Sequence, residues 1–154
     1  MKHLKIFEKF IEEFQLDEIS EDEYRSLTDK EGGEIDQSKL KTLKLNLKKI
    51  KKTRSLSLEY ECDYGDSWVT IVAIESENDG DIILRYFIDK CDLGDDEPYY
   101  KLLYQIEKIS GSWPISSNNN ENHYFYYLFE ESDFDKICEN PQILIDYLEK
   151  KSTT

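Results

Sequence analysis

The chain has 154 residues, 38% of them hydrophobic and 13% aromatic, which is enough apolar material for one folded domain over residues 1–154. The 34 acidic residues outnumber the 20 basic ones and give a formal net charge of -14, so the surface repels phosphates and anionic lipid and favours a basic protein partner. No stretch approaches the roughly 20 apolar residues that span a bilayer, so we expect no membrane contact. The three cysteines, Cys62, Cys91 and Cys138, form no CxxC pair, so we expect reduced thiols and a cytoplasmic protein.

Two helices are predicted in the first part of the chain. Apolar residues recur at helical spacing over residues 3–15 and predict a helix with one buried aromatic stripe. The stripe consists of Leu4, Phe7, Phe10, Ile11 and Phe14. In the acidic stretch that follows, residues 20–23 (Ser-Glu-Asp-Glu) have the form of a capping box and predict a short helix, which Gly32 and Gly33 would end.

Residues 37–54 contain eight of the 20 basic residues and no acid, which leaves 12 basic against 34 acidic residues elsewhere, a balance of -22. The leucines of this segment fit a strand or a helix, and we prefer a helix with a buried face of Leu40, Leu43, Leu47 and Ile50. We expect its basic surface to pair with the acidic body. The alternative is contact with nucleic acid or a membrane surface through residues 39–54, which the negative charge elsewhere and the lack of aromatics in the segment disfavour.

The hydrophobic period then changes to two and predicts three consecutive strands. These strands cover residues 56–62, 68–74 and 82–88. Residues 78–80 (Asn-Asp-Gly) predict a hairpin turn between the last two, because the positive φ angles of a type I′ turn suit these residue types. The three segments therefore predict an antiparallel meander.

An acidic run is predicted to open a central helix. Asp92, Asp95, Asp96 and Glu97 precede Pro98, which suits a first helical turn, and the helix macrodipole favours carboxylates at an N-terminus. The alternative for this run is a site for a hard cation, but the run lacks the glycine and the terminal Glu of a calcium loop. The buried face of the helix would consist of Tyr99, Leu102, Leu103, Ile106 and Ile109, and Gly111 and Pro114 would end it.

The last part of the chain predicts a polar loop over residues 116–122, a strand over residues 124–130, and two helices that start at Ser132 and at Asn140. The strand has large side chains on both faces, so either helices cover both faces or one aromatic face contacts a partner. Strands grouped between helices predict an α+β fold, with one antiparallel β-sheet (a meander) covered by N-terminal, central and C-terminal helices.

The sequence has no recognisable catalytic or metal-binding pattern. Nucleophilic catalysis needs a nucleophile held against a base, and the two imidazoles, His3 and His123, lie near a terminus and beside a predicted loop. Neither has a Cys or a second His at metal-ligand spacing, and there is no GxGxxG or GxxxxGK(S/T) sequence. We therefore expect a protein that is not an enzyme and uses no metal or cofactor.

Residues 60–68, with the sequence YECDYGDSW, resemble the Y-x-Y-D-F-G-D-x-W signature of the Ri-plasmid open-reading-frame-three-like family, whose members occur on plasmids and as passengers of insertion elements. The likeness continues at Val72, Ile74 and Glu75, and more weakly at residues 98–103, which look like that family's G-Y-x-x-L-L helix start. It departs at Thr70, where the family usually has His, and covers about a third of the chain. The resemblance implies a mobile-element context and an α+β fold, and it implies no reaction.

Residues 63–66 read independently as a turn between two strands, with Gly65 at a positive φ and Trp68 in the core. The functional alternative is an acidic edge that recognises a basic protein. This edge would be made of Asp63, Asp66 and Glu75, flanked by Tyr64 and Trp68.

The leading hypothesis is a small, acidic, non-enzymatic protein that neutralises a cognate basic protein such as a toxin or nuclease, as an immunity protein or antitoxin does. The second is an accessory protein of a plasmid or transposable element with nucleic-acid contact through residues 39–54. The third is a metal-assisted hydrolase that uses the carboxylates of Asp63, Asp66 and Glu75. The residues predicted to contact the partner are Asp63, Tyr64, Asp66, Trp68, Glu75, Asp92, Asp95, Asp96, Tyr124 and Tyr126.

Overall fold

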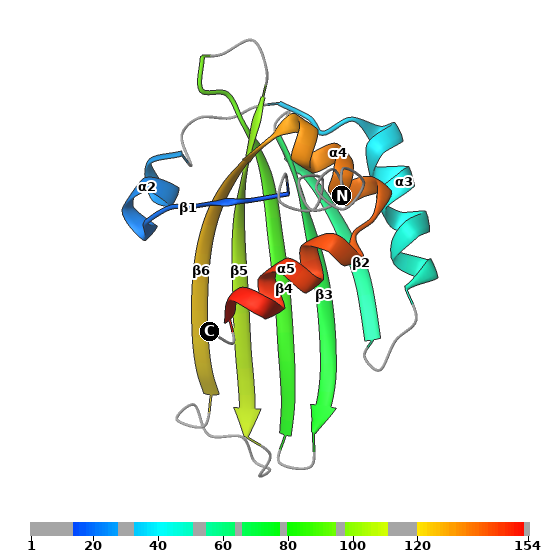
Figure 1. Cartoon of the computed structure of the whole chain (residues 1–154), viewed down its shortest axis with the longest axis vertical. Helices are drawn as coiled ribbons and strands as arrows, with labels where there is room; N and C mark the ends of the chain where they lie inside the picture. The colour runs from blue at the N-terminus through cyan, green and yellow to red at the C-terminus, as the bar shows by residue number, and fades with distance from the viewer. Residues whose placement is uncertain are drawn as a thin grey trace, which may run out of the picture.

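One antiparallel sheet forms the centre of the structure (Figure 1). The computed structural model describes residues 14–27, 33–50, 55–63, 66–77, 80–94, 98–110 and 120–152. Within these residues six strands lie in the order β1-β6-β5-β4-β3-β2. Their bounds are Asp17–Glu18 (β1), Ser55–Asp63 (β2), Asp66–Glu77 (β3), Gly80–Cys91 (β4), Tyr99–Ser110 (β5) and Asn120–Glu130 (β6).

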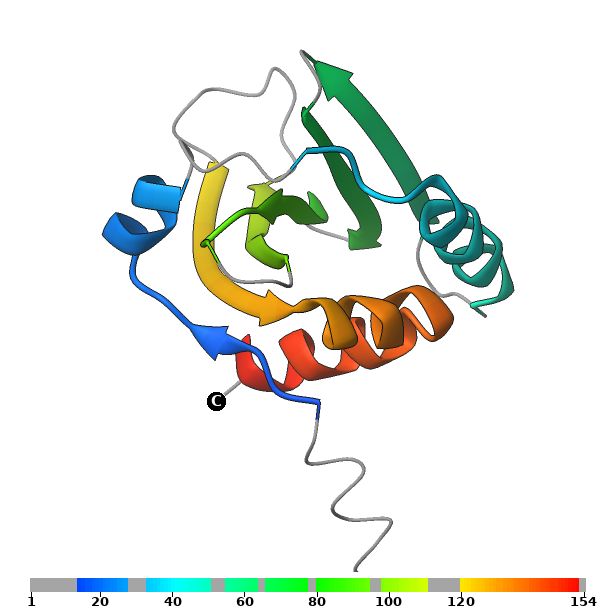
Figure 2. The same ribbon diagram turned by 90° about the horizontal axis from the view of Figure 1, so that it is seen from above.

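Four helices accompany the sheet in the described part of the chain: Glu21–Ser26 (α2), Gln37–Lys49 (α3), Glu131–Glu139 (α4) and Gln142–Ser152 (α5). Figures 1 and 2 show α3, α4 and α5 on one side of the sheet and α2 beside β6. This arrangement confirms the predicted α+β class, in which helices flank one antiparallel sheet. None of the described helices has the length and apolar character needed to cross a membrane.

The strands of the predicted meander pair in sequence order. Asp63 lies opposite Asp66 across β2 and β3, and Glu77 lies opposite Gly80 across β3 and β4, so only two residues separate each pair of strands. Gly80 has a φ of 143°, a value that L side chains rarely adopt. The meander is therefore confirmed, with strands longer than the alternating pattern predicts.

The central helix predicted over residues 99–109 is wrong, because these residues form β5. This strand pairs with β4 on one side and with β6 on the other, and thus satisfies backbone groups along the edges of both. Its apolar residues fit a period of two as well as a helical period, since Tyr100, Leu102 and Tyr104 alternate and are buried. Pairing with two neighbouring strands overrides the helical spacing.

The acidic run before β5 consequently caps no helix, since the chain after Pro98 is extended. Asp92 instead stands in the turn after β4, where its carboxylate accepts a hydrogen bond from the Gly94 N–H at 2.9 Å. Gly94 has a φ of 86°, which suits a glycine. Asp95 and Asp96 lie outside the described residues.

The capping box and the basic segment both form the predicted helices. The Ser20 Oγ accepts a hydrogen bond from the Glu23 N–H at 3.1 Å and starts α2, although this helix ends at Ser26 and not near the glycines. In α3 the exposed fraction of Leu45 is 58%, so the leucines do not share one strand face. The helical face is confirmed by the buried side chains of Leu40, Leu43 and Leu47.

The N-terminal segment enters the fold beside α5. Residues 3–13 of the predicted first helix lie outside the described residues, and residues 14–16 lead without a helix into β1. Phe14 is buried, and its ring meets the Tyr147 ring edge-on with centroids 5.6 Å apart. This aromatic contact ties the start of the described chain to the C-terminal helix.

The C-terminal elements follow the prediction with shifted boundaries. Strand β6 begins at Asn120, so the polar loop predicted over residues 116–122 is wrong from that residue onward. Helix α4 begins at Glu131, one position before the predicted Ser132, and no side chain caps it. Helix α5 follows Pro141, as predicted.

The hydrophobic core lies between α3, α4, α5 and the face of the sheet toward them, called here the inner face. Aromatic rings stack in it, with centroids 5.0 Å apart for Tyr86 and Tyr104 and 4.2 Å apart for Tyr100 and Phe134. The alternate strand positions form the outer face. It includes Trp68, Val72, Ile74, Ile83, Arg85, Phe87, Asp89, Lys101, Leu103, Gln105, Glu107, Tyr124 and Tyr126.

Candidate interaction surfaces

An acidic edge is built on β1 and α2. Backbone pairing of β1 with β6 holds the chain here, and the Ile19 N–H donates to the Tyr126 carbonyl at 3.0 Å. The Ser20 cap then turns the chain into α2, whose first turn is acidic. We define the acidic edge by five exposed side chains, those of Asp17, Glu18, Glu21, Asp22 and Glu23.

Tyr24 anchors α2 on the outer face of the sheet. Its ring lies 5.1 Å from the ring of Tyr126, and the Lys101 ammonium lies 4.7 Å from its centroid. Lys101 also pairs with Asp89 at 3.7 Å. Burial, with the negative charge of Asp89, raises the pKa of the Tyr24 hydroxyl, so the group stays neutral in this contact. The acidic edge is therefore held in a defined position.

The acidic character continues from β1 to the start of α4. A groove of about 330 Å³ lies there, and Asp17, Glu130, Asp133 and Lys136 are among the residues that line it. Burial raises the pKa of the Asp133 carboxyl, and the negative charges of Glu130 and Asp17 raise it further. Lys136 lies 3.9 Å from Asp133 and offsets part of this negative potential.

The basic residues of α3 lie on the other side of the molecule. Figure 2 shows α2 and α3 at opposite sides of the sheet. The exposed lysines of α3 are Lys41, Lys44, Lys48 and Lys49. The basic residues that cluster in the sequence are thus also separated in space from the acidic edge.

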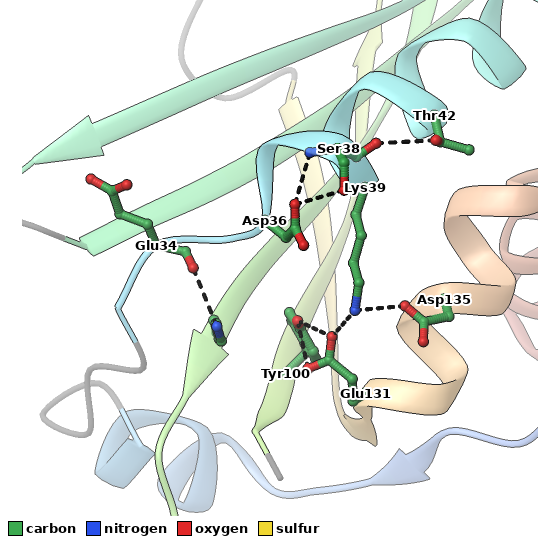
Figure 3. A network of polar contacts seen from close by, with 9 residues as sticks. Glu34, Asp36, Ser38, Lys39, Thr42, Tyr100, Glu131 and Asp135 are labelled. Atoms are coloured by element: carbon green, nitrogen blue, oxygen red, sulfur yellow. Dashed lines mark hydrogen bonds and ion pairs between the residues drawn. The ribbon is translucent and has the colours of Figure 1, made fainter.

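Lys39 joins α3 to α4 through a polar network (Figure 3). Its ammonium pairs with the carboxylates of Glu131 and of Asp135, the latter at 2.7 Å. Glu131 also accepts a hydrogen bond from the Tyr100 hydroxyl at 3.1 Å. Burial alone would lower the pKa of Lys39, but the hydrogen bonds to Asp135 and Glu131 outweigh it and raise that pKa. The expected pairing of the basic segment with the acidic body is confirmed for Lys39.

The start of α3 is fixed by a second group of contacts in Figure 3. The Asp36 carboxylate accepts hydrogen bonds from the Ser38 N–H at 2.8 Å and from its hydroxyl at 2.7 Å. These bonds lower the pKa of Asp36. The Lys90 ammonium of β4 donates to the Glu34 carbonyl at 3.2 Å. Together they position Lys39 above α4.

Cys138 lies beside this network, in a groove of about 230 Å³ that Lys39 and Asp135 also line. Burial, followed by the negative charge of Asp135, raises the pKa of the Cys138 thiol to about 12. A nucleophilic cysteine needs a lowered pKa, and a lysine that acts as a base needs one too. Both pKa values shift the other way. What the contacts of Lys39 with Glu131 and Asp135 show is a link between α3 and α4.

The backbone register separates the acidic residues that were grouped from the sequence. Asp63 and Asp66 lie opposite each other at the β2–β3 hairpin. Glu75 lies nine positions further along β3, which at roughly 3.3 Å per residue is about 30 Å away. Glu75 and the partly buried Trp68 occupy opposite faces of the sheet, because an odd number of positions separates them. Asp63 and Asp66 therefore do not form one compact edge with Glu75, and contact of each residue with a partner stays a prediction.

The other predicted contact residues fall into three groups. Asp92 is exposed at the turn after β4, at the same end of the sheet as the β2–β3 hairpin (Figure 1). Tyr124 is 49% exposed on the outer face, whereas Tyr126 is partly covered by Tyr24. Those outside the described residues are Tyr64, Asp95 and Asp96.

The residues of the acidic edge were not among the partner-contact residues predicted from the sequence. The sequence feature that could have indicated this edge is the capping box, because it places acidic residues in the first turn of α2. Within the described residues, no group of three or more His, Cys, Asp or Glu side chains is arranged to hold a metal ion. Comparison with protein-family models, with curated proteins and with solved structures finds no match.

Proposed function

We propose that this protein is a cytoplasmic, non-enzymatic binding protein that neutralises a basic partner, such as a toxin or nuclease, in the manner of an immunity protein or antitoxin. The observation that carries the proposal is the acidic edge, where five exposed carboxylates lie on a short segment held by β6 and by the Tyr24 anchor. The net charge of -14 adds a long-range attraction for a cationic partner.

The physical basis is electrostatic steering. Carboxylates gathered on one side of a molecule accelerate encounter with a positive surface and disfavour anionic competitors. The exposed lysines of α3 lie on the other side (Figure 2), so they do not cancel the potential of the acidic edge at short range. The pKa values of Lys39 and Cys138 are raised, whereas a catalytic lysine base or cysteine nucleophile needs a lowered pKa. The polar network around Lys39 therefore supports a binding protein over an enzyme.

The triple variant Glu18→Gln, Asp22→Asn, Glu23→Gln should slow association with the partner about tenfold at low salt and leave the dissociation rate nearly unchanged. It removes three charges but keeps the Ser20 cap, because that bond goes to the backbone of residue 23. The partner is first recovered from native cells by affinity capture at low salt, and the rates are then measured by surface plasmon resonance.

The matched control is Lys41→Gln, Lys44→Gln, Lys48→Gln, which removes three exposed charges from α3. It should not slow association. If both triple variants slowed association equally, the position of the acidic edge would not explain the association rate, and this role of the edge would be contradicted. Failure to recover any stoichiometric basic protein from the native cells would contradict the proposed function itself.

The exposed lysines of α3 favour a second candidate, an accessory protein of a plasmid or transposable element that contacts nucleic acid through residues 39–54. The variant Lys41→Glu, Lys44→Glu, Lys48→Glu, Lys49→Glu should then abolish a salt-dependent mobility shift of duplex DNA. Each lysine that contacts a phosphate makes the slope of log K against log salt more negative by about 0.9.

The acidic-edge variant serves as the control, and it should bind DNA at least as well as the parent protein. Absence of any shift with the parent protein at low salt would remove this candidate. The resemblance of residues 60–68 to the plasmid family stays a prediction; residues 98–103, likened to its helix start, lie at the beginning of β5.

A further inference from the structure

Part of the outer face of the sheet is apolar. An antiparallel sheet with helices on one face normally has polar residues on the other. Here Ile74 is 40% exposed and Tyr124 is 49% exposed, and their apolar neighbours on this face are partly buried. We call these side chains the open sheet surface: Val72, Ile74, Ile83, Phe87, Leu103 and Tyr124.

The strand sequences already carry this feature. Residues 71–74 of β3 and residues 82–84 of β4 are continuous apolar runs, a pattern typical of strands that are covered on both faces. The inner side chains of these strands, such as Ile71 and Leu84, are buried in the core. The outer ones, such as Val72 and Ile83, are therefore additional apolar surface that the core does not require.

Helix α2 borders this surface and does not cover it. Tyr24 lies over Tyr126 and Lys101, which occupy one end of the outer face. The next positions along the strands, Leu103 and Phe87, lie opposite each other and begin the open sheet surface. The other described helices pack on the inner face (Figures 1 and 2).

Two arginines within and beside this surface are paired, and exposed acids border it in the described part of the chain. Arg85 lies within the outer face, where it pairs with Glu107 at 3.2 Å. At the border Arg25 of α2 pairs with Glu21 at 2.7 Å, which leaves Asp22 and Glu23 as exposed acids of the same helix. An occupant of the surface thus meets apolar side chains beside carboxylates.

We infer that the open sheet surface binds a basic amphipathic segment of the partner, with apolar side chains on β3 and β4 and cationic side chains toward α2. This inference rests on the proposed function and names the kind of segment that is bound. Charge complementarity favours this occupant. A nucleic acid or an anionic lipid would meet like charge at the acidic edge, and so would a second copy of this chain placed symmetrically on the same surface.

The test uses a synthetic helical peptide with a stripe of leucines among lysines, and a control peptide with the same residues scrambled. Methyl NMR spectra of the intact protein should show shifts at Val72, Ile74 and Ile83 when the striped peptide is added. Fluorescence anisotropy should show that it binds about tenfold more tightly than the scrambled peptide, since anchors on such a surface contribute about 1.4 kcal/mol or more.

The variant Ile74→Ser, Tyr124→Ser should remove this tenfold preference. Its control is Leu45→Ser, which changes a side chain with an exposed fraction of 58% on α3 and should leave the preference intact. Thermal unfolding checks that both variants keep the parent fold. Unchanged preference in the double variant, or methyl shifts confined to other surfaces, would overturn the inference.

The two proposals fail in different ways. If both peptides bind equally and the acidic-edge variant weakens both, the acidic edge acts without the open sheet surface, and only the further inference is lost. If neither peptide binds at low salt, the further inference is overturned, and the capture experiment with native cells then decides the proposed function separately.

Discussion

Replacement of Leu43 by alanine should lower the free energy of unfolding by about 2–5 kcal/mol, the usual cost of a large cavity in a core. The Leu43 side chain is fully buried between α3 and the sheet. The matched change Leu45→Ala, two positions along the same helix, should alter the free energy of unfolding by less than about 0.5 kcal/mol, because Leu45 is 58% exposed. Urea denaturation of the two variants measures both values.

This pair of variants also tests the helix itself. In a strand, Leu43, Leu45 and Leu47 would share a face, and the two alanine variants would cost similar amounts. In the helix, Leu43 and Leu47 lie on the buried face and Leu45 does not. Equal destabilisation by Leu43→Ala and Leu45→Ala would therefore contradict the helical assignment of the basic segment.

The protein should lose stability steeply in alkali. Burial raises the pKa of Tyr127 from 10.0 to about 12 and that of Cys138 from 9.0 to about 12. Burial, with the negative charge of Glu131, raises the pKa of Tyr100 as well, and burial likewise raises the pKa of Tyr24. The folded state thus keeps protons that the unfolded chain has released, and stability that is fully present below pH 9 falls as the pH rises.

The expected slope follows from the number of groups. Each contributes about 1.4 kcal/mol per pH unit once the pH exceeds its unfolded pKa, so the four buried groups together should lower the unfolding free energy by about 5–6 kcal/mol per unit above pH 10. Urea titrations at several pH values measure this slope. Tyr127→Phe should reduce this slope by about one quarter. An unchanged slope in that variant would contradict the raised pKa of Tyr127 in the folded state.

Several elements could be predicted from the sequence because their signals are local. The capping box starts α2 through a contact between Ser20 and Glu23, three positions apart. The period of the leucines predicts the buried face of α3, and the hairpin residues predict the β3–β4 turn. Each of these signals depends on residues within a few positions of one another. Their conformational propensities and spacing decide the local secondary structure.

The strand β5 could not be predicted in this way. Its apolar residues fit both periods, and the choice between them depends on free backbone groups of β4 and β6, which are distant in sequence. The candidate site was missed for a related reason. The acids at positions 17 and 18 become part of a defined edge because β1 pairs with Leu128 and Tyr127 of β6, and no local pattern specifies that pairing.

Composition and short-range spacing thus established the fold class, most of the helices and strands, and the strong negative charge. The tertiary structure alone showed that Asp63 and Glu75 lie far apart, that acids near β1 and α2 gather at one edge, and that apolar side chains of β3 and β4 are left on the outer face. Such juxtapositions come from hydrogen bonds and packing between distant segments. The free energy of these contacts depends on the whole sheet and is not contained in any single stretch of the chain.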